Sequence, residues 1–203
     1  MLRGERNRRL IVDAVLAFVR EGVAYPTAEQ IAARARVGTR TVFRHFADME
    51  GLYAAVNERI GAEVAPLLAG GFEGSAAARI RELTRRRTTL YERIAPFRRR
   101  TSAREPLARV IRAGIRTLDG TLRAQLREAL LPVADEIDLD SLEALDAAFS
   151  FECWDRLRVA QGLSKNRAAD VMQRTATALL AAHLPLPRAA PAHRQEAPGV
   201  RSS

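Results

Sequence analysis

The sequence has a single cysteine, Cys153, among 203 residues. One cysteine cannot form an intramolecular disulfide or a cysteine-rich zinc site, so both are excluded, and we expect Cys153 to be a small buried apolar residue. Histidine occurs only at His45, His183 and His193, and no group of histidine, cysteine or carboxylate residues has a metal-binding spacing such as H-E-x-x-H. We therefore expect no metal and no cofactor.

Long apolar runs are also missing. No stretch approaches the roughly 18 consecutive apolar residues of a membrane span, and the opening MLRGERNRRL has neither the apolar segment nor the cleavage site of a signal peptide. These absences predict a cytoplasmic protein without membrane contact. The motifs G-x-S-x-G, P-loop and G-x-G-x-x-G are missing too, so we do not expect an enzyme; only a site built from carboxylates is left open.

Aromatic residues make up only 5% of the chain, whereas Ala, Leu and Arg are abundant. Glycine and proline fall mostly outside the segments with helical periodicity, and such a composition favours helices. With 203 residues, of which 47% are hydrophobic, the chain can bury one large core or two smaller ones. The fold class that we predict is all-α.

The formal net charge of +9 is unevenly distributed along the chain. Residues 71–130 contain 15 arginines and 6 acidic residues, an excess of +9, whereas residues 1–70 contain 10 arginines and 8 acidic residues, an excess of +2. The total suggests an acidic partner such as DNA. Because the excess lies in the middle of the chain, net charge alone does not locate a DNA-binding surface.

Apolar residues recur at helical spacing in segments that are separated by glycine, proline and capping residues. Thr27 and Gln30 can form a capping box before a short helix, and Asp48 can cap the long helix after it. The helices that we predict span 5–21, 27–34, 38–46, 48–70, 75–95, 105–130, 141–162 and 165–184. We expect the later breaks at Gly70 to Gly74, Pro96, Pro132 and Gly162.

The segment GTRTVFRHF, residues 38–46, has two chemically different faces when it is wound as a helix. Successive residues turn by about 100° around a helix axis, which places Val42, Phe43 and Phe46 on one face. The opposite face carries Arg40, Thr41, Arg44 and His45. We predict that the apolar face packs on neighbouring helices while the polar face meets a partner outside the protein.

Two short helices joined by a tight turn, as predicted for TAEQIAARARVGTRTVFRHFADMEGLYAAV at residues 27–56, form a helix-turn-helix. This stretch resembles the DNA-binding domain of the TetR family of transcriptional regulators, whose pattern is approximately T-x-x-x-I-A-x-x-A-G-V-S-x-x-T-L-Y-x-H-F-x-x-K-x-x-L. The matching positions are Thr27, Ile31, Ala32, Ala35, Val37, Thr41, His45, Phe46 and Leu52. The resemblance implies that the second of the two helices lies in the major groove of DNA.

Four positions depart from the family pattern. Arg36 stands where the turn usually has glycine, and a side chain in a left-handed turn costs roughly 1 kcal/mol. Gly38 replaces the usual serine cap. Phe43 replaces a tyrosine, keeping its packing ring but losing a phosphate-binding hydroxyl, and Met49 replaces a lysine that also contacts phosphate.

The resemblance assigns the main DNA contacts to Arg40 and Arg44, because arginine fits the guanine edge. Thr41 and His45 would assist, and Thr27 would meet phosphate at the start of its helix. The complete predicted set of DNA-binding residues is Thr27, Arg36, Thr39, Arg40, Thr41, Phe43, Arg44 and His45. The alternative is a solvated helix face, on which Thr41 and His45 only satisfy local hydrogen bonds.

The resemblance also implies a homodimer held by the last two long helices, with the two recognition helices about 34 Å apart. The residues there that suit helix packing are Leu142, Leu145, Phe149, Trp154, Leu157, Ala168, Met172, Thr175, Ala176 and Leu179. A small-molecule effector pocket is implied among the middle helices, with candidates Tyr91, Phe97, Leu118, Phe151, Cys153 and Trp154. Taken singly, each of these residues is better explained as ordinary core; as a pocket, their apolar character favours a mostly apolar ligand.

Two arginine runs, 85–87 and 98–100, account for much of the net charge. A solvated face is the simplest interpretation. The alternatives are pairing with the acidic segment 135–155 of the same chain, an anionic ligand, or long-range attraction to DNA.

The predicted organisation is a helix-turn-helix DNA-binding domain at 1–48 and a helical ligand-binding and dimerisation domain at 49–184, in which 49–70 is the connecting helix. The proline-rich segment 185–203 is predicted to be a disordered tail. Such a protein is expected to be a ligand-responsive repressor that binds a palindromic operator as a homodimer. The alternative function is a helical adaptor or small-molecule-binding module with weak or lost operator binding, which the departures at Arg36, Phe43 and Met49 would explain.

Overall fold

The computed structural model describes residues 3–23, 25–99 and 107–182, and these residues form helices joined by short turns. No strand occurs in the described residues, so the all-α prediction is confirmed. The predicted tail at 185–203 lies outside them. The elements are α1 Arg3–Arg20, α2 Ala28–Ala35, α3 Thr39–His45, α4 Met49–Leu68, α5 Ala76–Arg98, α6 Leu107–Leu130, the 3₁₀ helix η1 Leu131–Glu136, α7 Leu139–Ala148, α8 Phe151–Asp155, the π-helix η2 Arg156–Ala160 and α9 Lys165–Ala181.

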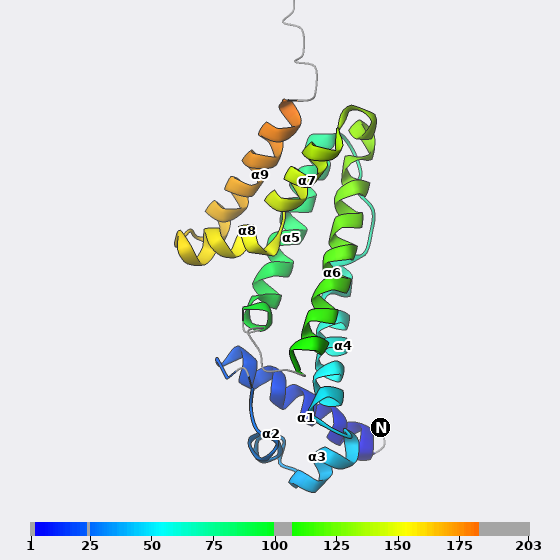
Figure 1. Ribbon diagram of the computed structural model, residues 1–203, viewed down its shortest axis with the longest axis vertical. Helices are drawn as coiled ribbons and strands as arrows, with labels where there is room; N and C mark the ends of the chain where they lie inside the picture. Colours follow the sequence, from blue (N-terminus) through cyan, green and yellow to red (C-terminus); the bar gives the residue numbers. More distant parts are fainter. Residues whose placement is uncertain (1–2, 24, 100–106, 183–203) are drawn as a thin grey trace, which may run out of the picture.

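The helices are arranged along one long axis (Figure 1). The short helices α2 and α3 lie with α1 at one end, and α4 leads away from them. The helices α4, α5 and α6 pack on one another along the body of the molecule, while α9 packs on α5 and α7. The end that carries α2 and α3 is therefore separated from α7 and α9 by the length of the α4–α6 layer.

Two hydrophobic cores stabilise this arrangement. The first joins α1, α2, α3 and the N-terminal half of α4, and the second joins the C-terminal half of α4 to α5–α9. Leu52 and Val56 of α4 belong to the first core, whereas Val64 of the same helix belongs to the second. Because α4 contributes to both cores, it is the rigid link between them. The predicted domain boundary at 48/49 stays a prediction.

Side-chain caps fix the starts of the N-terminal helices. The Gln30 backbone N–H donates to the Thr27 hydroxyl at 3.3 Å, and the Thr27 N–H donates to the Gln30 side-chain oxygen at 2.8 Å. This reciprocal pair is the predicted capping box, and it satisfies two backbone donors at the start of α2. Asp48 caps α4 by accepting from the Gly51 N–H at 2.8 Å, also as predicted.

Two predicted helix boundaries are wrong. The helix predicted to end before Pro96 continues through it to Arg98, because a proline in the last turn removes only one of the final helical hydrogen bonds. The helix predicted to span 141–162 is divided into α7, α8 and η2. Ser150 interrupts it, since its hydroxyl accepts the Cys153 N–H at 3.1 Å and starts a new helix. The predicted break at Gly162 is confirmed by its φ of 63°.

Most of the residues predicted to suit dimer packing lie inside the chain instead. The side chains that are buried in the second core are Leu145, Phe149, Trp154, Leu157, Ala168, Met172 and Ala176. Of the predicted set, Thr175 is exposed, and Leu142 and Leu179 are half-buried. The buried residues hold α7–α9 against α5 and are therefore not available to a partner.

Candidate nucleic-acid interface

The turn between α2 and α3 contains a residue in the left-handed conformation. Arg36 has φ 54° and ψ 43°, and it is the one non-glycine residue with positive φ in the described part of the chain. The Arg36 N–H donates to the Ala33 carbonyl at 3.2 Å and the Val37 N–H to the Ala32 carbonyl at 3.0 Å, which closes the end of α2. The prediction that this position needs a left-handed residue is confirmed, and the turn forms without glycine.

The recognition helix α3 is anchored by two apolar side chains. Val42 and Phe46 are 1% and 5% exposed and belong to the first core. The Arg8 guanidinium of α1 lies 5.3 Å from the centre of the Phe46 ring. Because α1 and α2 both pack on α3, this seven-residue helix is held in one orientation although it is too short to be stable alone.

Arg40 and Arg44 point away from the protein. Both side chains are exposed, and neither has a hydrogen bond or ion pair within the part of the chain that the structure describes. They lie four residues apart, so they share one side of α3. Two guanidinium groups without a protein partner on a firmly anchored helix are suited to contact phosphates or base edges.

Two residues of α3 do not lie on the predicted faces. Phe43 was expected on the packing face, but its side chain is 47% exposed. His45 was expected on the outward face, but it is half-buried, its Nε2 is buried without a partner among the described residues, and its Cε1 lies near Gly4 of α1. Both predictions are wrong because Val42 and Phe46 set the inward direction, so that His45 faces α1 and Phe43 is turned to solvent.

The remaining predicted DNA-binding residues have mixed surroundings. Arg36 is exposed, and Thr39 and Thr41 are half-buried. The exposed Thr27 is engaged locally: the backbone N–H of Glu29 and the Thr27 hydroxyl both lower the pKa of the Glu29 carboxyl. The structure therefore brings seven of the eight predicted residues to one end of the molecule in outward or rim positions and turns His45 inward.

Sequence comparison identifies the N-terminal part of the chain. Residues 10–56 match the family model described as bacterial regulatory proteins, tetR family, and the match includes all of α2 and α3. The chain is a TetR-family regulator. The resemblance found in residues 27–56 is thereby confirmed, and the α2–α3 unit of this TetR-family chain is a DNA-binding helix-turn-helix. No curated protein has a sequence that matches the chain.

Solved structures share the fold of the whole chain. A transcriptional regulator from Rhodococcus sp. Rha1 is similar with a TM-score of 0.66 and 17% sequence identity, covering 92% of this chain and 100% of its own. A TetR-like transcriptional regulator from the same source has a TM-score of 0.57 and 18% identity, covering 89% of this chain and 98% of its own. The helical domain thus has the same fold as these regulators, although the sequences have diverged widely.

A cavity of about 380 Å³ lies in the helical domain between α4, α5 and α6. Of the predicted ligand-binding residues, Phe97 and Leu118 line it, whereas Phe151 lines a neighbouring cavity of about 420 Å³. Tyr91 and Trp154 are core residues, 1% and 0% exposed, and line neither cavity. Burial raises the pKa of the Tyr91 hydroxyl, which donates to the Phe149 carbonyl at 2.5 Å.

The sequence analysis missed the α4 residues of this cavity and, apart from Leu118, its α6 residues. On α4 the wall contains Asn57 and Gly61, and on α6 it contains Gly114. Cys153 was expected to be buried but is half-buried, and it lines neither cavity. Two glycines within helices were the one available signal, because glycine disfavours helix interiors and often marks a close approach or an open space.

The arginine runs are a solvated face only in part: the Arg85 side chain is 64% exposed, but other residues of the runs are paired or buried. Arg98 forms ion pairs with Asp119 at 2.7 Å and Glu152 at 3.0 Å, and Arg99 pairs with Asp155 at 2.5 Å. Arg87 is 2% exposed. The simplest interpretation is therefore wrong for these residues, and the alternative of pairing with the acidic segment 135–155 is confirmed for Arg98 and Arg99. Arg100 lies outside the described residues.

Across the described residues, no helix has the length and apolar character needed to cross a membrane. Within the same residues, no cluster of histidine, cysteine and carboxylate side chains could hold a metal ion.

Proposed function

We propose that this chain is a ligand-responsive transcriptional repressor that binds a palindromic operator as a homodimer in the cytoplasm. The observation that supports DNA binding most directly is the pair Arg40 and Arg44, which are exposed and without a protein partner on a helix anchored by Val42 and Phe46. Arginine forms bidentate hydrogen bonds with guanine in the major groove, which gives this helix a means of reading sequence.

Phosphate contacts would come from the rim of the same surface. Arg36 and the start of α2 lie beside α3, and exposed arginines or helix N-termini bind phosphate without reading the base sequence. The exposed ring of Phe43 offers an apolar contact to a thymine methyl group or to a sugar. Because arginine–phosphate contacts release counterions, the affinity for DNA is expected to fall steeply as the salt concentration rises.

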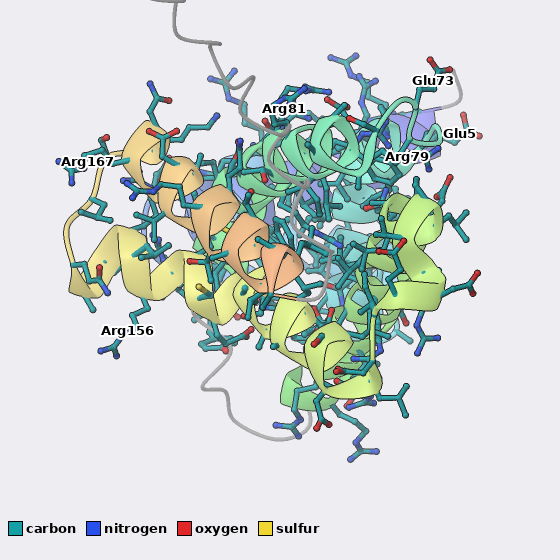
Figure 2. All side chains as sticks on the ribbon, turned by 90° about the horizontal axis from the view of Figure 1, so that it is seen from above. Glu5, Glu73, Arg79, Arg81, Arg156 and Arg167 are labelled. Atoms are coloured by element: carbon teal, nitrogen blue, oxygen red, sulfur yellow. The ribbon has the colours of Figure 1, made fainter. Side chains whose placement is uncertain are left out.

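Dimerisation is proposed through the outward sides of α8, η2 and α9. One side of α9 is buried in the second core, while Thr175, Ala178 and Ala182 are exposed on the other side. These small residues permit close approach of a partner helix. On the same part of the molecule, Arg156 of η2 and Arg167 of α9 point outward (Figure 2). Two copies would then present their α3 helices about one DNA turn apart, roughly 34 Å.

The cavity between α4, α5 and α6 is proposed as the effector site. Its residues Ile60, Phe97 and Ile111 also pack against the first core, which contains the anchors of α3. A ligand that favours a different spacing of α4 and α6 would therefore shift the position of α3 and weaken operator binding. The chain is proposed to have no catalytic activity of its own.

The test of DNA recognition is to select bound duplexes from a random pool and measure their affinity for variants of α3. We expect a palindrome, and we expect Arg44→Ala to weaken binding about tenfold or more, because a bidentate arginine contact contributes about 1–3 kcal/mol of discrimination. Arg116→Ala is the matched control, since Arg116 is also an exposed arginine but lies on α6, outside the helix-turn-helix.

The contrary outcomes are equally specific. Unchanged affinity of Arg44→Ala for the selected duplex would sink the assignment of α3 as the reading helix. Recovery of random sequences without a palindrome would favour the alternative function, a small-molecule-binding or adaptor module without an operator.

A further inference from the structure

The shape of the cavity between α4, α5 and α6 limits the size of its ligand. Its volume of about 380 Å³ is near the lower end of the roughly 300–1,000 Å³ found for small-molecule sites. Such a space holds a small molecule and not a folded partner or a peptide. The chemistry of the wall then decides the class of small molecule.

The wall is largely aliphatic. It is formed by the apolar side chains Ile60, Val64, Leu68, Ile94, Phe97, Ile111, Ile115 and Leu118. Neutral polar groups come from the Asn57 amide and from the hydroxyls of Thr117 and Thr121. Both hydroxyls donate to a carbonyl of their own helix, at 3.1 Å in each case, so they present acceptor lone pairs to the cavity.

The buried charged group of the wall is already paired. Among the described wall residues, the one buried ionic group is Arg98, whose side chain is 9% exposed, and it is paired with Asp119 and Glu152. The two carboxylates together outweigh the guanidinium by one negative charge, so Arg98 has no uncompensated positive charge to offer an anion. The two carboxylates are 46% and 70% exposed, so they are solvated outside the cavity and offer no buried partner to a cation.

Glu58 is the second charged residue of the wall, and it does not favour the binding of a charged ligand either. Its side chain is 76% exposed, and it lies 3.9 Å from Arg8 of α1. A buried charge without a compensating partner is strongly unfavourable, and an aliphatic wall offers none. A ligand with no net charge avoids the cost of burying an unpaired charge, whether negative or positive.

We propose that this cavity binds an uncharged, lipophilic small molecule that carries one hydrogen-bonding group. The inference rests on the proposed ligand response and names the class of its ligand. The apolar body lies between α4 and α6, and the single polar group meets the Asn57 amide or a threonine hydroxyl. Fatty acids, organic cations and phosphorylated metabolites are excluded as high-affinity ligands of this cavity.

Gly61 gives the means to close the cavity without disturbing the fold. It lies on the face of α4 that also carries Asn57, Val64 and Leu68, and a Cβ built there meets no atom within 4 Å. Packing therefore does not require glycine at this position, although glycine is among the least favourable residues inside a helix. The open space beside Gly61 is part of the ligand volume.

The first test compares three ligands with the same apolar body on the full chain without DNA: 1-decanol, decanoate and decylammonium, titrated by calorimetry at pH 7. We expect 1-decanol to bind at least tenfold more tightly than either ion, because only the ions carry a charge into the aliphatic cavity. Equal or tighter binding of decanoate or decylammonium, or no binding of the alcohol, overturns the proposal.

The second test locates the binding. Gly61→Leu should reduce 1-decanol affinity at least tenfold, whereas Gly120→Leu should leave it unchanged, because Gly120 is also a helical glycine with open space around it but lies outside the cavity. Unchanged binding by Gly61→Leu contradicts the assignment, and circular dichroism melting checks that both variants fold. If a variant does not fold, the comparison of 1-decanol, decanoate and decylammonium on the wild-type chain still decides the question.

A separate measurement keeps this proposal distinct from the proposed function. Selected operator DNA is titrated with the wild-type chain in the presence and absence of 1-decanol. Release of DNA supports both the ligand class and the ligand response. Binding of 1-decanol without any change in DNA affinity supports the ligand class and contradicts the ligand response. Absence of DNA binding both with and without 1-decanol contradicts the repressor assignment and leaves the ligand class unaffected.

Discussion

At the scale of single residues, two arginines of α5 show how differently one side chain type can be used. Arg98 is surrounded by Asp119 and Glu152, which outweigh the effect of burial and raise its pKa. Arg87 is 2% exposed and donates to the Leu122 carbonyl, but its Nε and Nη1 have no partner among the described residues. Burial lowers the pKa of Arg87, so its charge is the least favourable one in the second core.

Replacement of Arg87 should therefore stabilise the protein. Methionine has a similar length and no charge, and we expect Arg87→Met to raise the free energy of unfolding by about 1 kcal/mol or more, since buried ionic groups are often replaced by apolar ones with a gain. Arg98→Met is the control and should lower it by about 1 kcal/mol through lost ion pairs. Urea denaturation of both variants decides the question, and a destabilised Arg87→Met would show that the guanidinium has partners that hold it.

The outcome at Arg36 shows what a local pattern can predict. Comparison with the family pattern indicates a left-handed turn at this position, and the backbone adopts it with φ 54° despite the arginine side chain. A turn conformation is set by hydrogen bonds over a few residues, those of Arg36 and Val37 to α2, so it can be read from a short stretch of sequence. The free-energy cost of the left-handed conformation at Arg36 is small compared with the stabilisation that α2 and α3 gain from packing.

At the scale of elements, Arg86 ties α5 to the segment before it through several contacts. Arg86 donates to the carbonyls of Ala69, Gly70 and Gly71 at 3.2, 2.6 and 2.9 Å, and it lies over the Phe72 ring. It also pairs with Glu82 at 2.7 Å. Arg86 thus holds three successive carbonyls of the non-helical connection between α4 and α5.

Arg86 and its neighbour Arg85 form a matched pair for mutation. Both contact Glu82 at 2.7 Å, but the Arg86 side chain is 13% exposed and the Arg85 side chain is 64% exposed. We expect Arg86→Lys to lower the free energy of unfolding by about 1–3 kcal/mol, because an ammonium group cannot reproduce three carbonyl contacts. Arg85→Lys should cost less than about 0.5 kcal/mol. Equal effects in chemical denaturation would argue against a special role for Arg86.

The division of the helix predicted at 141–162 has an element-scale cause. The periodicity of residues 141–162 is continuous in sequence, yet the Ser150 hydroxyl caps a new helix and turns α8 away from α7. A serine can face solvent within a helix or cap the next one, and the choice depends on what each segment packs against. At α8 that choice places Phe151 and Trp154 in the core, a contact that periodicity alone does not contain.

At the scale of the whole molecule, the proposed operator binding depends on the proposed dimer. The apolar side of α9 is used within the chain, through Ala168, Met172 and Ala176. The proposed interface therefore uses the outward side of α9, where Ala178 is exposed. A dimer that fails to form would leave one α3 per molecule, and a single half-site binds DNA far more weakly than two linked ones.

A bulky charge on that outward side should separate the dimer. We expect Ala178→Arg to sediment as a monomer at micromolar concentration, where the wild type is a dimer, and to lose affinity for the selected palindrome. Ala124→Arg, the same change at an exposed position of α6, should do neither. A wild-type monomer, or a dimer that survives Ala178→Arg, would contradict the proposed interface.

The sequence by itself determined the helices of the N-terminal domain, their caps at Thr27 and Asp48, the left-handed turn at Arg36, and the presence of Arg40 and Arg44 on α3. These features depend on residues close together in the chain, where hydrogen-bonding groups and helical periodicity act directly.

The tertiary structure alone decided the rotation of α3, the pairing of Arg98 with Asp119 and Glu152, and the cavity beside Gly61. The rotation turned His45 inward and Phe43 outward because α1 and α2 pack on α3 from fixed directions. Ion pairs and cavities join segments that are distant in sequence, so their existence depends on how several helices pack at once.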